Sequence, residues 1–315
     1  MFLIALQNVG LMLLMAIPGF IIVKLKAVDG DKSVKFVSVL LLYVCQPFIT
    51  FDAFLNISFD SAILVNMVLC FVLTALLMTL IATLTYPLFG KLRLNECDRG
   101  IYAYASAFGN IGYMCVPFLQ ILAPDNREII IYAGAAIVAF NLVAWTLGNY
   151  LITHDKRHIK IKNILLNPPT LAFLIVLPLF LFDINFVRFP VAGIQQIIDL
   201  LANLVGPLAM VLVGMCFANA NLRKLFTNAK AYIAIGLKLV ISPLIAFLLL
   251  KLTNVFFDTS DINLNIIALA AMPSANNLIM FCSISKLDTE HATALILLST
   301  LISIVTIPLA LELLL

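Results

Sequence analysis

Ten stretches of this sequence are apolar enough and long enough to cross a lipid bilayer as helices, and this feature limits the fold more than any other. A spanning helix needs about 20 predominantly apolar residues. In hydrocarbon every backbone N–H and C=O must be paired within the protein, so only helices and closed barrels span membranes. We therefore expect an all-α polytopic membrane protein with ten transmembrane helices, near residues 3–23, 35–55, 61–89, 100–122, 127–152, 168–183, 192–217, 230–251, 262–284 and 291–313.

Composition supports lipid as the solvent. The chain is 63% hydrophobic and 11% charged, whereas a soluble domain has about 25% charged residues. The 6 cysteines lie mostly inside apolar runs and form no CxxC or Cys/His spacing, so no metal site and no cofactor are expected. The first stretch lacks a basic leader and a small-residue cleavage site, which favours a retained helix over a signal peptide.

Four prolines recur at a fixed interval. Pro18 and Pro47 are 29 residues apart, as are Pro178 and Pro207, and the offset between the two pairs is 160. Proline removes a backbone donor and kinks a membrane helix. Kinks in register indicate one helical unit used twice, a pattern typical of secondary transporters. The alternative is coincidence, because prolines are common in membrane helices.

Lysine and arginine are distributed unevenly over the connections. Only Arg127, Arg188 and Lys251 follow even-numbered stretches. Because cytoplasmic loops attract Lys and Arg, the connections after odd-numbered stretches are predicted to be cytoplasmic, with both termini outside a cell membrane. Fifteen lysines and arginines lie in the connections after odd-numbered stretches: Lys24, Lys26, Lys32, Lys35, Lys91, Arg93, Arg99, Lys156, Arg157, Lys160, Lys162, Arg223, Lys224, Lys230 and Lys286.

The longest polar connection, at residues 154–163, divides the chain into two halves. We predict a first five-helix repeat at 1–153, a cytoplasmic connecting loop at 154–167 and a second five-helix repeat at 168–315. With five helices in each half, the second half enters the membrane from the opposite side. The repeats are therefore inverted, which permits alternating access around a central site.

The fourth and ninth stretches have the least helix-like sequence, and their weak points coincide in the repeat. Gly and Pro are unfavourable inside helices. We predict non-helical segments at 109–115 and 272–276 that cross at mid-membrane. The residues responsible are Gly109, Asn110, Gly112 and Pro117 in the fourth stretch and Pro273, Ser274, Asn276 and Asn277 in the ninth.

A break exposes the N–H groups of one half-helix and the C=O groups of the other. Such a break is tolerated only against protein or a wet cavity. Two breaks that cross can bind an anion, with asparagine amides as further donors. Asn110 and Asn277 are the principal candidate ligands, and Asn276, Ser274, Pro117 and Pro273 complete the predicted site. The alternative is that Gly and Pro permit close packing and the asparagines bond between helices.

Three further polar residues have more than one interpretation. Gln46 either lines the cavity or bonds the carbonyl freed by Pro47. Asp52 is a coupling group if it lies deep and a solvated helix end if it lies at the outer rim. Lys238 either couples transport to protons, supplies a fixed charge for an anion, or extends to the cytoplasmic interface about two turns away. We expect no basic side chain at the crossover itself, so that helix ends and amides carry the binding.

Several function classes are excluded by missing motifs. The sequence has no Walker A pattern for ATP and no TVGYG-type potassium filter. It also lacks the multiple inward-facing acidic residues expected of a cation pump. We therefore expect a protein that is not an enzyme.

Segments spread over the whole chain carry a family resemblance. They are SAFGNIGYMCVPFL, the NPP start of the sixth stretch, KLVISPL, AAMPSANNL and STLISIVTIPL. With these segments in this order, the chain resembles the auxin efflux carrier family. The resemblance implies two inverted five-helix repeats, a scaffold part and a transport part that moves as an elevator, in the fold of bile-acid/sodium symporters and sodium/proton antiporters. It also implies a carboxylate site beside the crossover, near Asn110 and Asn277.

The chain lacks the long hydrophilic loop of plant auxin carriers, which favours a short prokaryotic member and dicarboxylates such as malate or malonate over auxin. The leading hypothesis is a secondary active transporter for small organic carboxylates. Its rivals are a sodium- or proton-coupled antiporter or symporter of the same fold and a membrane receptor or scaffold. Expected partners are a small monocarboxylate or dicarboxylate and the lipid bilayer, without nucleic acid. The coupling ion, H+ or Na+, and a homodimeric assembly stay open.

Overall fold

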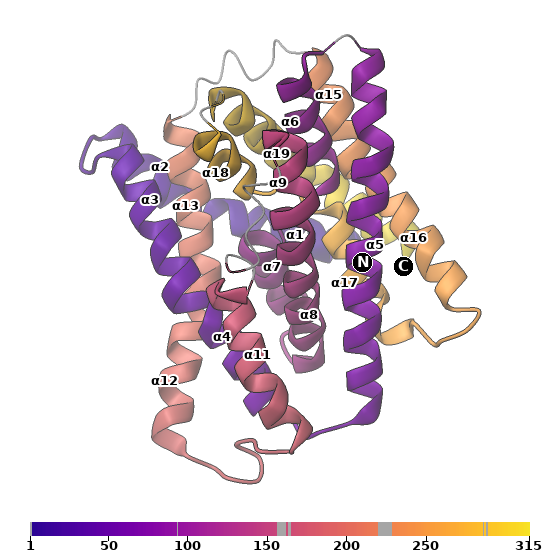
Figure 1. Cartoon of the computed structure of the whole chain (residues 1–315). Coiled ribbons are helices and arrows are strands. Elements are labelled where there is room, and N and C mark those ends of the chain that lie inside the picture. Colours follow the sequence, from indigo (N-terminus) through magenta and orange to yellow (C-terminus); the bar gives the residue numbers. More distant parts are fainter. Residues whose placement is uncertain are drawn as a thin grey trace.

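The computed structural model describes residues 2–92, 94–155, 162, 165–219, 229–285, 287 and 289–315. These residues form a bundle of helices (Figure 1). Within them, 7 helices are long and apolar enough to cross a membrane. They are α1–α2 (Phe2–Leu14, Ile17–Lys24), α3–α4 (Gly30–Leu40, Gln46–Leu55), α5 (Ser61–Lys91), α8–α9 (Arg127–Val143, Asn149–Thr153), α12–α13 (Ala192–Asn203, Val205–Asn219), α15–α16 (Ala229–Gly236, Ser242–Thr253) and α19 (Thr289–Leu314).

The other three predicted stretches are also helical but short or interrupted. Helix α11 spans only Pro168–Leu181. The fourth stretch consists of α6 (Glu96–Ala107), a π-helical turn (Ile111–Cys115) and α7 (Val116–Leu122). The ninth consists of a 3-10 turn (Ser260–Ile262), α17 (Asn263–Ala271) and α18 (Asn277–Ile284). An all-α polytopic membrane protein is thereby confirmed.

Three proline positions share one local device, a π-helical turn that ends two residues before the ring. The turns are Leu41–Cys45, Ile111–Cys115 and Leu237–Ile241, and the prolines are Pro47, Pro117 and Pro243. In each case the residue before proline donates its N–H to the carbonyl five residues back. The wider turn moves the chain away from the carbonyl that the ring would otherwise strike.

The four repeat-related prolines give unequal distortions. The helix is interrupted between α1 and α2 just before Pro18, and between α12 and α13 just before Pro207. Pro47 follows its π turn. Helix α11, however, continues through Pro178 without an interruption. Pro178 lies one turn from the end of α11, where few further hydrogen bonds remain to be disturbed.

The helices fall into two packing groups. Helices α2, α3, α4, α11, α12 and α13 pack mainly against one another, on the left of Figure 1. Helices α5 to α9 and α15 to α19 form the other group. Helix α1 packs against α7 and α19 of the second group. Within the first group α2 and α13 touch backbone to backbone: a Cβ on Gly19 would overlap the carbonyl oxygen of Val211, and one on Gly214 would overlap that of Ala16.

Three connections show that the described helices turn at two opposite ends of the bundle. The link from α5 to α6 is at the top of Figure 1, and those from α4 to α5 and α11 to α12 are at the bottom. This arrangement agrees with the chain order used in the charge argument. Seven of the basic residues in that argument lie outside the described residues: Arg93, Lys156, Arg157, Lys160, Arg223, Lys224 and Lys286.

Candidate functional site

The breaks in the fourth and ninth stretches pair with each other. Gly109 and Ser274 form an isolated antiparallel bridge. The N–H of Asn110 donates to the carbonyl of Pro273 at 2.8 Å, and the N–H of Ala275 donates to the carbonyl of Phe108 at 2.9 Å. A strand-like pair thus satisfies buried backbone groups that neither helix can satisfy alone.

Both predicted breaks exist, with one shift in position. The ninth stretch is non-α-helical over 272–276, as predicted. In the fourth stretch the break is 108–110, shorter than the predicted 109–115 and one residue earlier. The reason is that residues 111–115 close a π turn ahead of Pro117 and so regain helical hydrogen bonds at once.

Ser274 holds the crossover together. Its hydroxyl donates to the carbonyl of Ala105 at 2.8 Å, near the end of α6. Its N–H donates to the hydroxyl of Ser299 in α19 at 3.0 Å, and both serines are 0% exposed. Ser299 was missed by sequence reasoning because α19 contains several serines and threonines, and nothing in the sequence distinguishes this one. It lies in the STLISIVTIPL segment, which is the one clue the sequence offers.

Lys238 lies at the crossover, so the expectation of no basic side chain there was wrong, and the interfacial alternative for Lys238 is excluded. Its ammonium donates to the carbonyl of Ala270 at 2.9 Å, and the side chain is 1% exposed. A Cβ on Gly109 would lie 3.0 Å from the same nitrogen. Lys238 therefore does not reach toward the cytoplasmic interface, and the crossover does contain a basic side chain. The π turn that carries Lys238 packs against α17 and α19, which turns the side chain inward.

Gln46 and Pro117 mark where the first helix group meets the broken helix. The Nε2 atom of Gln46 in α4 is 2.6 Å from the position that a Cβ on Gly112 would take. The Cβ of Pro117 is 3.5 Å from the corresponding position at Gly206 in α13. Because these two contacts come from different helices, the short helix from Ile111 to Leu122 is held between α4 and α13.

Asparagines stand at the start of both half-helices that follow the breaks. Asn110 precedes the helical run that begins at Ile111, and it is 4% exposed. Asn276 and Asn277 begin α18 and are half-buried. Asn276 lines a small cavity of about 10 Å³ together with Val213, Cys216, Ile279, Thr293, Ile296, Leu297 and Thr300. The deep burial of Asn110 and Lys238 means that a ligand reaches them only when the surrounding helices separate.

Asp52 is the one predicted site residue that lies apart from the crossover. Its carboxylate pairs with Arg127 at 3.3 Å and accepts a hydrogen bond from Asn56 at 2.7 Å. The Asn56 amide oxygen in turn accepts from Gln195 of α12 at 2.8 Å. The Asp52 side chain is 25% exposed. These contacts agree with a helix end near a solvated rim.

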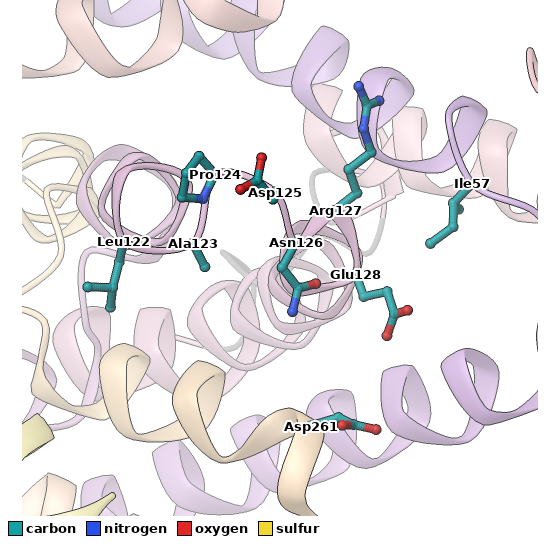
Figure 2. A pocket seen from close by; sticks show the side chains of 9 residues that line it. All are labelled: Ile57, Leu122, Ala123, Pro124, Asp125, Asn126, Arg127, Glu128 and Asp261. Atoms are coloured by element: carbon teal, nitrogen blue, oxygen red, sulfur yellow. The ribbon is translucent and has the colours of Figure 1, made fainter. Parts of the chain in front are cut away.

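A larger cavity, of about 840 Å³, opens beside Arg127 where α7 connects to α8 (Figure 2). Its polar lining combines three carboxylates, Asp125, Glu128 and Asp261, with Asn126 and Arg127. Behind it the Tyr132 hydroxyl donates to Glu128 at 2.9 Å, and Asn66 donates to Asp261 at 3.2 Å. The mainly acidic lining does not suit an organic anion, so this cavity is a poor candidate for the carboxylate site. No group of three His, Cys, Asp or Glu suited to a metal occurs in the described part of the chain.

Two interrupted helices, joined at their breaks inside a bundle of membrane-length helices, define a polytopic membrane protein with a central crossover. A protein-family model described as membrane transport protein matches residues 4–311 of this chain, which narrows the class of membrane protein to transporters. The chain therefore belongs to this transporter family, the auxin efflux carriers, which is not a family of enzymes. A search of curated proteins finds no match.

Proposed function

We propose that the protein is a secondary active transporter that moves small organic carboxylates across the cell membrane by alternating access, with its binding site at the crossover. The observation that carries the proposal is the pairing of the two breaks with asparagines at the start of both following half-helices. Helix N-termini present orphan N–H groups and a positive dipole end. Asparagine side chains add amide donors of the kind that a carboxylate accepts.

The same proposal includes two inverted five-helix repeats, residues 1–153 and 168–315, connected by 154–167. The two packing groups support an elevator motion, because one group can act as scaffold while the other carries the crossover. Gln46 and Pro117 lie at the boundary between the groups, where a moving site would meet the scaffold.

A sodium- or proton-coupled antiporter or symporter of the same fold is the alternative. The position of Asp52 does not favour it, because this carboxylate pairs with Arg127 near a solvated rim, apart from the crossover.

Uptake into proteoliposomes tests the proposal. Vesicles containing the purified chain are expected to accumulate or release radiolabelled malonate or malate faster than empty vesicles, and unlabelled carboxylate should compete. Replacing Na+ by choline and collapsing the pH gradient separate the coupling alternatives. If no carboxylate in a broad panel is transported or bound, the proposed substrate class is wrong.

Reporter fusions test the orientation. We expect a fusion placed within residues 154–163 to report a cytoplasmic position, because basic residues collect in the connections on that side. A fusion after residue 315 is expected to report the opposite side. If the fusion in the central loop reports an external position, the predicted orientation and the inverted-repeat arrangement are both wrong.

A further inference from the structure

The C-terminal ends of two half-helices converge on one ammonium group. Helix α17 ends at Ala271, and the carbonyl of Ala270 accepts from Lys238 at 2.9 Å. Helix α6 ends at Ala107, and Gly109, two residues later, lies directly against the Lys238 nitrogen. None of the ion pairs found among the described residues includes Lys238. The nitrogen therefore faces the Ala270 carbonyl and the two helix ends, with the thiol of Cys115 as the neighbouring titratable group.

Carbonyl groups at a helix C-terminus carry a negative partial charge and attract cations. In carriers built on interrupted helices, such carbonyls and C-terminal half-helix ends are where a coupling Na+ or H+ is bound. Here a covalently attached ammonium occupies that position. The opposite ends of the breaks, the helix starts at Asn110 and Asn277, remain for an anion.

We propose that Lys238 is a built-in cation of the crossover, which takes the place of a bound Na+ and balances the charge of the carboxylate held by Asn110 and Asn277. This inference rests on the proposed function for the carboxylate and on the local geometry for the cation. It implies that carboxylate binding does not require sodium. Because the ammonium is part of the chain, it would cross the membrane with the substrate rather than enter from solution.

Gly109 is a requirement of this arrangement. A Cβ at this position would lie 3.0 Å from both the Lys238 nitrogen and the carbonyl oxygen of Leu269. That distance is tighter than ordinary van der Waals contact, and the backbone carbonyl cannot move freely. Alanine at residue 109 would therefore displace the ammonium while leaving every charge in the protein unchanged.

The first test measures the cation without a substrate. The melting temperature of the purified wild-type protein is followed in NaCl and in choline chloride at equal ionic strength. We expect no sodium-specific shift, since Lys238 already fills the position. A sodium-specific stabilisation of the wild type would overturn the inference, whatever is found with carboxylates.

The second test titrates malonate and malate, in sodium-free buffer, against the wild type, Lys238→Gln and the control Lys251→Gln. Glutamine can still donate to Ala270 but has no charge. Lys251 is an exposed lysine of the same eighth span, over the ring of Phe247. Loss of the balancing charge is expected to weaken binding by roughly 10-fold or more in Lys238→Gln and to leave Lys251→Gln unchanged. Wild-type affinity in Lys238→Gln would overturn the inference.

If Lys238→Gln does not fold, Gly109→Ala replaces it, with Gly236→Ala as the control because a Cβ there meets nothing within 4 Å. Gly109→Ala should weaken carboxylate binding, and unchanged affinity would count against Lys238. Should the wild type bind no carboxylate at all, the proposed function fails, while the sodium measurement still decides whether Lys238 takes the place of a bound Na+.

Discussion

Asn110→Ala and Asn277→Ala are each expected to lower carboxylate affinity by roughly 10- to 150-fold while leaving the fold largely intact. The physical reason is the loss of one hydrogen bond to a charged ligand, which costs about 1.5–3 kcal/mol. Both residues stand where a half-helix begins, so their amides would add to the N–H groups that the helix start already presents. Binding by calorimetry or thermal shift, together with uptake in proteoliposomes, measures the effect.

Asn203→Ala provides the matched control, because this asparagine is exposed at the end of α12 and belongs to neither break. It should bind and transport as the wild type does. Wild-type affinity in both crossover variants, with affinity lost only in Lys238→Gln, would move the anion site away from the helix starts and toward the eighth span.

Gly214→Ala is expected to destabilise the protein by about 3 kcal/mol or more, at the upper end of overpacking effects. A Cβ on Gly214 would overlap the carbonyl oxygen of Ala16, which is backbone and cannot rotate away. Relief requires α2 and α13 to move apart along their whole contact. The measurement is the free energy of unfolding, or the denaturation midpoint, in detergent or bicelles.

Two glycines give controls for Gly214→Ala. A Cβ on Gly10 or on Gly236 would meet no atom within 4 Å, so alanine there should be neutral or slightly stabilising. Gly19→Ala tests the same interface from its other side, because its Cβ would overlap the carbonyl oxygen of Val211. If Gly214→Ala and Gly19→Ala unfold like Gly236→Ala, the close contact of α2 and α13 is wrong.

The breaks were predictable from sequence because their cause is local. Proline and glycine disfavour helix wherever they stand, so Pro273 and the Gly109–Gly112 pair could mark the interruptions before any coordinates existed. The exact extent in the fourth stretch was not predictable. It depends on a π turn, and nothing in the residues Ile111–Cys115 distinguishes a π turn from an α turn.

The depth of a polar side chain in the bundle and the residue that it contacts could not be predicted from the sequence, because both depend on how the helices pack. From its distance to the helix end, Lys238 could lie either at the interface or inside the bundle. Its position in the structure follows from the helix face that packs against α17 and α19. The partner of Asp52, Arg127, lies on a helix far along the chain. The acidic cavity in Figure 2 joins three connections that only the fold brings together, at Ile57, at 122–128 and at Asp261.

The bridge at Gly109 and Ser274 limits how the molecule can change shape. It consists of two backbone hydrogen bonds, at 2.8 and 2.9 Å, between segments that come from opposite halves of the chain. Such bonds weaken steeply when they lengthen or bend. A slide of one half past the other at this point would break them with no water to replace them. In the proposed elevator motion the mobile unit would therefore draw helices from both halves, and the boundary along which it slides would differ from the boundary between the proposed repeats.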